Sequence, residues 1–136
     1  MSATTLNIPA TAPDPPRVSG PALRTFFRIA EAWRLGIKDQ IVLLGRPSKS
    51  SFYRWKQVEN VALPHDTLER LSYLFGIYSA LQILLPQPEA ADSWIRKPNT
   101  APLFGGRSAL ERMLSGQVAD LYMVRQYLDA QKGGWT

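Results

Sequence analysis

The sequence has no cysteine, which excludes disulfide bonds, thiolate zinc sites and cysteine nucleophiles. It has a single histidine, His65, which stands beside Asp66 at an expected helix start and needs no catalytic role there. No Walker motif and no dinucleotide-binding glycine motif occurs. An enzyme is therefore not expected, and neither is a metal site or a cofactor. A small enzyme built on His65 and the nearby acids remains a competing hypothesis, which unchanged behaviour of His65→Ala would remove.

Long apolar runs are also missing. The N-terminus lacks the basic region and the apolar core of a signal peptide, and no stretch approaches the roughly eighteen apolar residues needed to span a bilayer. A soluble cytoplasmic protein that does not enter a membrane is therefore expected. Alternating strand patterns are absent too, and hydrophobic residues recur instead at three- and four-residue spacing. This predicts an all-α fold, and no internal repeat is present.

Positive charge is concentrated in the first part of the chain. The net charge is +5; residues 1–60 hold nine Lys or Arg against four Asp or Glu, while residues 61–136 hold seven of each. A basic segment of this kind fits phosphate binding, which releases counterions and weakens as salt rises. Charge alone leaves open the alternative of a solvated basic surface without a partner.

The most informative motif is the run R-P-S-K-S-S-F-Y-R-W-K-Q at residues 46–57, which contains no acid. It follows K-D-Q-I-V-L-L-G, residues 38–45, which is typical of a short apolar helix closed by glycine. Residues 45–47 are then expected to form a turn, with Ser48 capping the second helix. Together the two runs predict a helix-turn-helix whose second helix enters a major groove of DNA.

The second helix of the motif should have a protein face and a DNA face. Phe52 and Trp55 stand three residues apart, so they share one face and should pack against the protein. Arg54 is suited to guanine and Gln57 to adenine, whereas the serines and lysines suit phosphates. The residues expected to contact DNA are Arg46, Ser48, Lys49, Ser50, Ser51, Tyr53, Arg54, Lys56 and Gln57.

Two segments are expected in the first half of the chain. Residues 1–20 are rich in proline and lack hydrophobic periodicity, which predicts a disordered arm. Residues 21–62 should form the DNA-binding segment, opening with an amphipathic helix that begins at Pro21 and is ended by Gly36.

The second half, residues 63–132, should form a helical domain suited to dimerisation. It opens with a long helix from His65 that Pro86 stops, and its wide apolar face suits a central or dimer-forming helix. Ser108 and Glu111 form a capping box for a later helix. The remaining expected segments are a helix at 89–96, a loop at 97–107, a helix at 108–114 and a last helix at 117–131.

The last four residues, 133–136, are expected to form a tail. Its tryptophan stands on a glycine hinge, which suits insertion into the cleft of another protein. Folding of Trp135 back onto the last helix is an equal alternative. In the same way, Trp94 and the loop after it either pack as a corner of the domain or form part of a partner-binding face.

Three runs then carry a family resemblance. They are A-D-S-W-I-R-K-P-N, L-F-G-G-R-S-A-L-E-R-M-L-S-G and Y-M-V-R-Q-Y-L-D-A-Q-K-G-G-W. With the helix from His65 they strongly resemble bacterial Xre/MbcA/ParS-type antitoxins, most closely the ParS branch. The resemblance extends from about Lys38 to Trp135, nearly three quarters of the chain.

The resemblance implies an antitoxin with two parts, an Xre-like helix-turn-helix for operator DNA and, at residues 63–132, a helical dimerisation and toxin-binding domain. The implied partner is a RES-domain toxin, an enzyme that consumes NAD by degrading it or by transferring ADP-ribose. A homodimer within a hetero-oligomer, two antitoxins to two toxins, is implied as well, with the end of the chain blocking the toxin's NAD pocket. The implied toxin-binding residues are Trp94, Arg96, Asn99, Gly105, Gly106, Arg107, Lys132, Gly133, Gly134, Trp135 and Thr136. The alternative is a stand-alone Xre-like dimeric repressor whose C-terminal helices serve only dimerisation.

Overall fold

A computed structural model describes residues 15–57 and 59–133, which contain helices and no strand, as the all-α prediction requires. None of the described helices is long and apolar enough to cross a membrane. In chain order the elements are α2 (Pro15–Ala32), α3 (Ile37–Leu43), α4 (Lys49–Gln57), α5 (His65–Leu84), α6 (Pro88–Ser93), the 3-10 turn η1 (Trp94–Arg96), α7 (Ala109–Met113) and α8 (Val118–Gln131).

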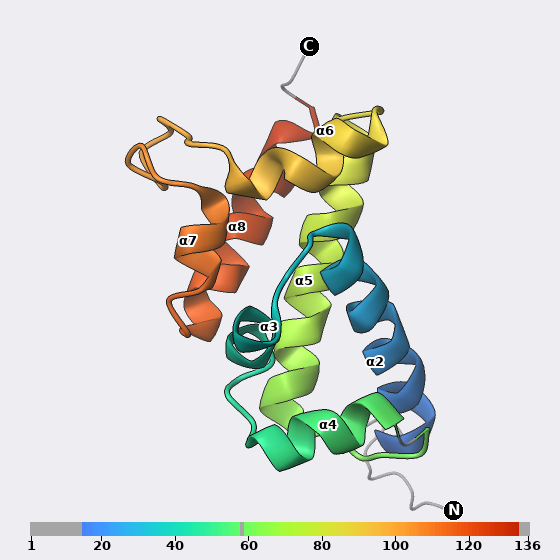
Figure 1. The fold of residues 1–136 in the computed structure, drawn as a ribbon. Coiled ribbons are helices and arrows are strands. Elements are labelled where there is room, and N and C mark those ends of the chain that lie inside the picture. Colours follow the sequence, from blue (N-terminus) through green and yellow to red (C-terminus); the bar gives the residue numbers. More distant parts are fainter. Residues whose placement is uncertain (1–14, 58, 134–136) are drawn as a thin grey trace, which may run out of the picture.

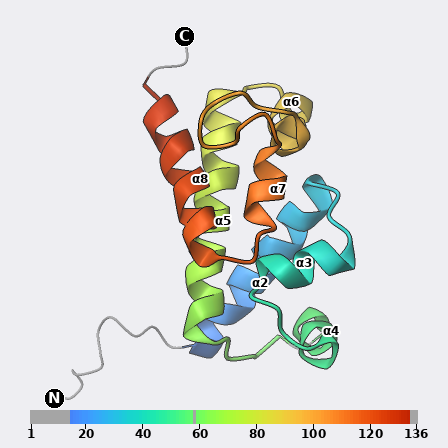
Figure 2. The same cartoon turned by 90° about the vertical axis from the view of Figure 1, so that its left-hand side faces the viewer.

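Helix α5 is the axis of the fold. Figures 1 and 2 show α8 running alongside it on one side, with α2 on the other. Leu74, Ile77 and Leu81 of α5 are completely buried. Its wide apolar face is therefore explained by neighbours on more than one side, which confirms the prediction of a central helix.

Helix α2 begins at Pro15, so the prediction that residues 15–20 belong to a disordered arm is wrong. The reason is a long-range contact that proline content does not reveal. Ser19 is fully buried and its hydroxyl accepts a hydrogen bond from the Leu63 amide at 3.2 Å. A Cβ at Gly20 would lie 2.6 Å from the carbonyl oxygen of Glu59, so only glycine lets α2 pass this close to the loop before α5. Residues 1–14 lie outside the described part of the chain.

Helix α2 ends in a left-handed turn at Arg34, which has φ of 56°. The amides of residues 34 and 35 donate back into the last turn at 3.0 and 2.9 Å, the pattern of a Schellman cap. Nη2 of Arg96 donates to the carbonyl oxygens of Trp33 and Arg34 at 2.7 and 2.8 Å, which satisfies carbonyls that the helix leaves free. The prediction that Gly36 ends this helix is wrong, because Gly36 is instead the N-cap residue of α3.

We expect Arg34→Gly to raise the free energy of unfolding by about 0.5–1 kcal/mol, because glycine adopts a positive φ without the steric cost that other residues bear. Arg28→Gly, at an exposed position inside the same helix, should lower it by about 1 kcal/mol. Urea unfolding followed by circular dichroism measures both changes. A loss of stability in both variants would contradict this account of the turn.

The helix-turn-helix forms as predicted. Gly45 has φ of 98° and follows α3, while the amides of residues 45 and 46 return to the last turn of α3 at 3.1 and 2.8 Å. The hydroxyl of Ser48 accepts from the amide of Ser51 at 3.1 Å, which confirms Ser48 as the cap of α4.

The C-terminal half also follows the predicted order. The capping box of Ser108 and Glu111 is present at the start of α7. Between η1 and α7 the chain makes a narrow loop, closed by a bridge between Pro98 and Ser108 and by an amide of Asn99 that donates to the Arg107 carbonyl at 3.0 Å. The helix expected at 89–96 is split between α6 and η1.

Candidate nucleic-acid and protein interfaces

Helix α4 presents the two faces that its sequence predicts. Phe52 is fully buried and Trp55 is 6% exposed, so both pack into the core as predicted. The Phe52 ring meets the Phe27 ring of α2 edge to face, with centroids 5.9 Å apart. The remaining outward positions of α4 that were expected to contact DNA are all exposed: Lys49, Ser50, Tyr53, Arg54, Lys56 and Gln57.

Three other residues expected to contact DNA have partners within the protein. Ser48 and Ser51 bond to each other through their hydroxyls at 3.1 Å. The guanidinium of Arg46 lies over Gly116, where a Cβ would come within 2.7 Å of its Nη2 atom. On α4 itself, the Lys56 ammonium lies 5.5 Å from the centre of the Phe27 ring, in a cation–π arrangement. These contacts fix the side chains without removing Arg46 or Lys56 from the surface.

A shallow groove of about 600 Å³ separates α3 from α4. Ile37, Ile41 and Val42 of α3 line it, and cationic side chains surround this apolar lining. Such a surface can accept the sugar or a thymine methyl group while its cations meet phosphates. Sequence reasoning missed the α3 contribution, although the apolar run at residues 41–44 was visible and only part of it, Leu43 and Leu44, is buried.

Six of the residues that the resemblance assigns to toxin binding precede α8 and fall into three groups. Trp94 belongs to an aromatic cluster with Phe104 and Tyr127, whose ring centroids lie 5.2 to 6.5 Å apart. Arg96 clamps the end of α2, as described above. Asn99, Gly105, Gly106 and Arg107 build the narrow loop, in which Gly106 has φ of 90° and its amide donates to the Asn99 carbonyl at 2.8 Å.

Near these groups an open groove of about 710 Å³ lies between the loop and α8. It is lined by Leu103, Met123 and Tyr127 among others, and Met123 is 40% exposed. Lys132 and Gly133 are exposed just beyond α8, whereas Gly134, Trp135 and Thr136 lie outside the described residues. Sequence reasoning missed Met123 and Leu103; the available signal was that Met123 stands off the apolar stripe of its helix.

Tyr73 and Tyr78 of α5 do not titrate near neutral pH, because the pKa of each is raised. The Tyr73 hydroxyl donates to Glu69 at 2.9 Å, and this bond, followed by burial, raises the pKa of Tyr73. Burial and then the charge of Asp92 raise the pKa of Tyr78. Within the described residues, no three His, Cys, Asp or Glu side chains gather where they could hold a metal ion.

The two candidate interfaces lie at different ends of the molecule. Figure 1 shows α4 at the lower end, while the end of α8 and helix α6 lie at the upper end; Figure 2 shows the same separation from the side. The two surfaces therefore do not overlap.

Two family models match the chain. The antitoxin Xre-like helix-turn-helix domain matches residues 12–76, and the antitoxin Xre/MbcA/ParS C-terminal toxin-binding domain matches residues 80–134. The chain is 55% identical over 112 residues to the uncharacterized protein y4oB of Sinorhizobium fredii (strain NBRC 101917 / NGR234). The matched residues make up 82% of this chain and 84% of that protein. No solved structure matches the chain. Helix α5 spans the boundary between the two matched segments.

Proposed function

The chain belongs to the Xre/MbcA/ParS antitoxin family, and from this premise we propose that it neutralises a RES-domain toxin and represses its own operon. The toxin would be an NAD-consuming or ADP-ribosylating enzyme, as the resemblance to the ParS branch implies. The observation that carries the proposal is the toxin-binding match over residues 80–134. If the chain were a stand-alone repressor, its toxin-binding domain at residues 80–134 would have no toxin to bind.

Inhibition would act by steric occlusion of the toxin's active site. Residues 133–136 would enter the NAD pocket, so that the tail and the substrate cannot occupy it together. The position of the last described residues supports this route, because Lys132 and Gly133 are exposed beyond α8 and next to the groove that Met123 and Tyr127 line. The aromatic cluster of Trp94 would hold the loop and α8 in place, while Arg107, exposed at the base of the loop, would contact the toxin directly.

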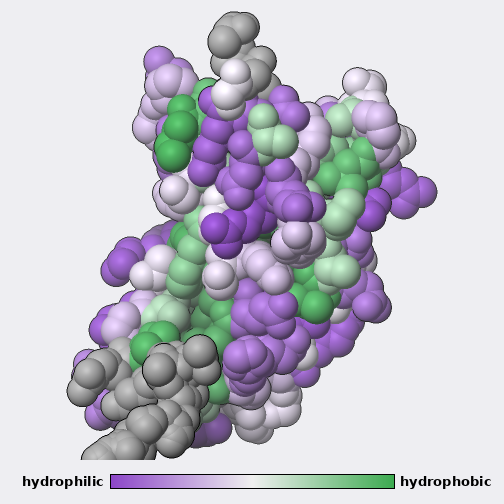
Figure 3. All heavy atoms as spheres, turned by 180° about the vertical axis from the view of Figure 1, so that it is seen from behind, coloured by the Kyte–Doolittle hydropathy of each residue, from purple (hydrophilic) through white to green (hydrophobic). Residues whose placement is uncertain are grey.

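A homodimer within a two-to-two complex is part of the same proposal. Seen from behind, hydrophobic side chains form separate patches among hydrophilic ones (Figure 3). One apolar groove of about 490 Å³ lies between α2, α5 and α8 and is lined by Val18, Ala22, Leu68 and Phe75. A second copy would bury this groove, and the dimer would present two α4 helices to the two halves of an operator.

For the DNA interface, we expect Arg54→Ala to weaken operator binding by about 1–3 kcal/mol and to relax the preference at one base pair. Lys49→Ala should instead weaken binding to all sequences alike, because a phosphate contact carries no base information. Fluorescence anisotropy with the operator and with single-base variants of it measures both. An equal loss on every sequence for Arg54→Ala would make Arg54 a phosphate contact.

Complex formation tests the toxin half of the proposal. We expect the product of the adjacent gene to co-purify with this chain in a stable complex, whose mass by light scattering gives a ratio of two to two. If no complex forms while the chain alone binds its operator, the stand-alone repressor becomes the correct account.

A further inference from the structure

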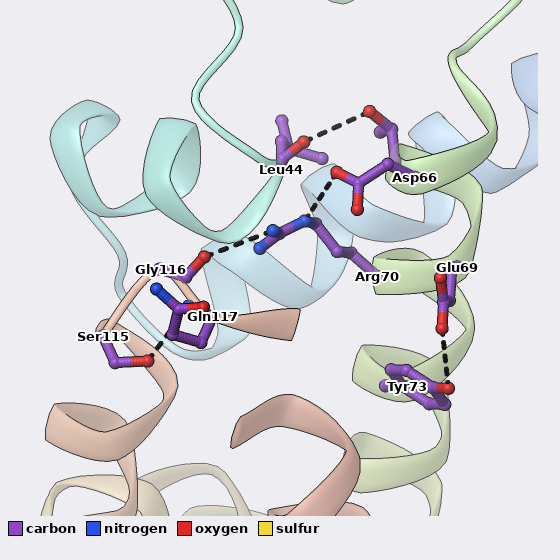
Figure 4. A network of polar contacts seen from close by, with 9 residues as sticks. Leu44, Asp66, Glu69, Arg70, Tyr73, Ser115, Gly116 and Gln117 are labelled. Atoms are coloured by element: carbon purple, nitrogen blue, oxygen red, sulfur yellow. Dashed lines mark hydrogen bonds and ion pairs between the residues drawn. The ribbon is translucent and has the colours of Figure 1, made fainter. Parts of the chain in front are cut away.

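Arg70 is the only buried charged residue in the described part of the chain, and it stands where three segments meet. It lies in α5, close to the helix-turn-helix turn on one side and to the turn between α7 and α8 on the other. Figure 4 shows Asp66, Arg70 and Gly116 in this junction. The junction residues are defined as Gly45, Arg46, Asp66, Arg70 and Gly116.

On the DNA-binding side, Arg70 packs directly on the backbone of the turn between α3 and α4. Its Nε atom donates to Oδ2 of Asp66 at 2.8 Å. A Cβ at Gly45 would lie 2.9 Å from that oxygen and 3.1 Å from Nε, so the ion pair occupies the space where a side chain would be. Thr67 adds a hydrogen bond from its hydroxyl to the Leu44 carbonyl at 3.2 Å. The start of α5 therefore holds the turn that leads into α4.

On the toxin-binding side, two arginines hold Gly116. Nη2 of Arg70 donates to the Gly116 carbonyl at 3.2 Å, and the guanidinium of Arg46 lies over the same glycine. Gly116 has φ of 90°, and a Cβ there would collide with Arg46. This turn is itself tied down, because the Ser115 hydroxyl bonds to Asp120 and accepts from the Gln117 amide.

From this geometry we propose that Arg70 is a positioning residue for α4, and that it couples operator binding to the α7–α8 turn of the toxin-binding domain. The inference rests on the proposed operator binding. A recognition helix contacts base edges with its N-terminal residues, and here the turn held by Arg70 leads into those residues. A small displacement of that turn misplaces every base contact that α4 makes.

The test compares Arg70→Lys with Arg125→Lys in the full chain. Lysine keeps the charge but has one donor centre, so it cannot hold both Asp66 and Gly116 as the guanidinium does. Arg125 also donates from a helix to a backbone carbonyl, that of Ser72 at 3.3 Å, but joins α8 to α5 and not to the turn before α4. Because it lines the groove between α2, α5 and α8, light scattering first verifies that both variants keep the mass of the wild type. The probe is a labelled duplex of the DNA upstream of the chain's own coding sequence, measured by anisotropy over a range of salt concentrations.

We expect Arg70→Lys to weaken operator binding by about tenfold and to leave the slope of log affinity against log salt unchanged. Arg125→Lys should bind as the wild type does. An unchanged affinity for Arg70→Lys would overturn the inference, and so would a slope lower by about 0.9, which marks the loss of a direct phosphate contact.

Gly116→Ala tests the same junction from the toxin-binding side and keeps the proposal testable if Arg70→Lys fails to fold by circular dichroism. It should also weaken operator binding, and the double variant should lose less than the product of the two single losses. The coupling would be overturned if the double variant lost operator affinity by the full product of the two single losses. It would also be overturned if Gly116→Ala bound the operator as the wild type does. If the wild-type chain binds the upstream DNA no more tightly than an unrelated duplex, both the proposed operator binding and the inference are overturned. If the wild type does prefer the upstream DNA but the variants bind it equally well, the inference alone is overturned.

Discussion

Deletion of residues 133–136 is expected to restore NAD consumption by the toxin while the complex with the toxin still forms. The tail is proposed to occupy the NAD pocket, and the loop and α8 are proposed to provide the rest of the interface. Interface tryptophans are among the residues that contribute about 2 kcal/mol or more when buried in a pocket. Trp135→Ala should therefore weaken the complex by about thirtyfold or more. An NAD-consumption assay and a titration of the two proteins measure the two effects.

Operator affinity of the same truncated chain is the internal control. Because α4 and the end of α8 lie at opposite ends of the molecule, the deletion should leave operator binding unchanged. Full neutralisation by the truncated chain would rule out the tail as the inhibiting segment and would move the site of inhibition to the loop around Arg107.

Phe52→Ala should cause the largest loss of stability among the substitutions considered. Phe52 is completely buried and packs against Phe27, so its removal leaves a cavity under α4 and should lower the free energy of unfolding by about 3–5 kcal/mol. That is a large part of the stability of a typical small domain, about 5–15 kcal/mol. Urea unfolding followed by circular dichroism measures the change.

The neighbouring residue gives a matched control. Tyr53 stands on the same helix but is 44% exposed, so Tyr53→Ala should cost about 1 kcal/mol or less. Equal losses for the two variants would contradict the orientation of α4, and with it the assignment of the outward residues to DNA.

The parts of the fold that depend on local patterns could be predicted from the sequence. The spacing of Phe52 and Trp55 gave the orientation of α4, and the Ser108 and Glu111 pair gave the start of α7. The wide apolar face of residues 65–85 gave a central helix. In each case residues close in sequence determine the local structure, and the tertiary packing is consistent with that local preference.

The parts that depend on contacts between distant residues could not be predicted. Residues 15–20 are helical because Ser19 and Gly20 pack against a loop more than thirty-five residues further on, and no local pattern reveals this contact. Arg34 takes a conformation typical of glycine, and Arg96, sixty-two residues away, donates a hydrogen bond to its carbonyl. The junction at Arg70 joins segments 46 residues apart in the same way.

The candidate sites divide along the same line. The outward residues of α4 follow from helix geometry, so their exposure could be predicted. The α3 lining of the groove and the exposure of Met123 depend on how the helices pack, so they could not be predicted. Some residues assigned by resemblance bond to other parts of this chain, as Arg96 does to the end of α2. Assignment of the remaining exposed residues to the toxin remains a proposal.

The most direct test of the antitoxin account is NAD consumption by the purified product of the adjacent gene, measured as this chain is added in increasing amounts. The account predicts that NAD turnover falls to zero when the chain reaches a one-to-one ratio with that enzyme, as expected for a tight complex that blocks the active site. Turnover that continues at an unchanged rate in the presence of excess chain would contradict the account.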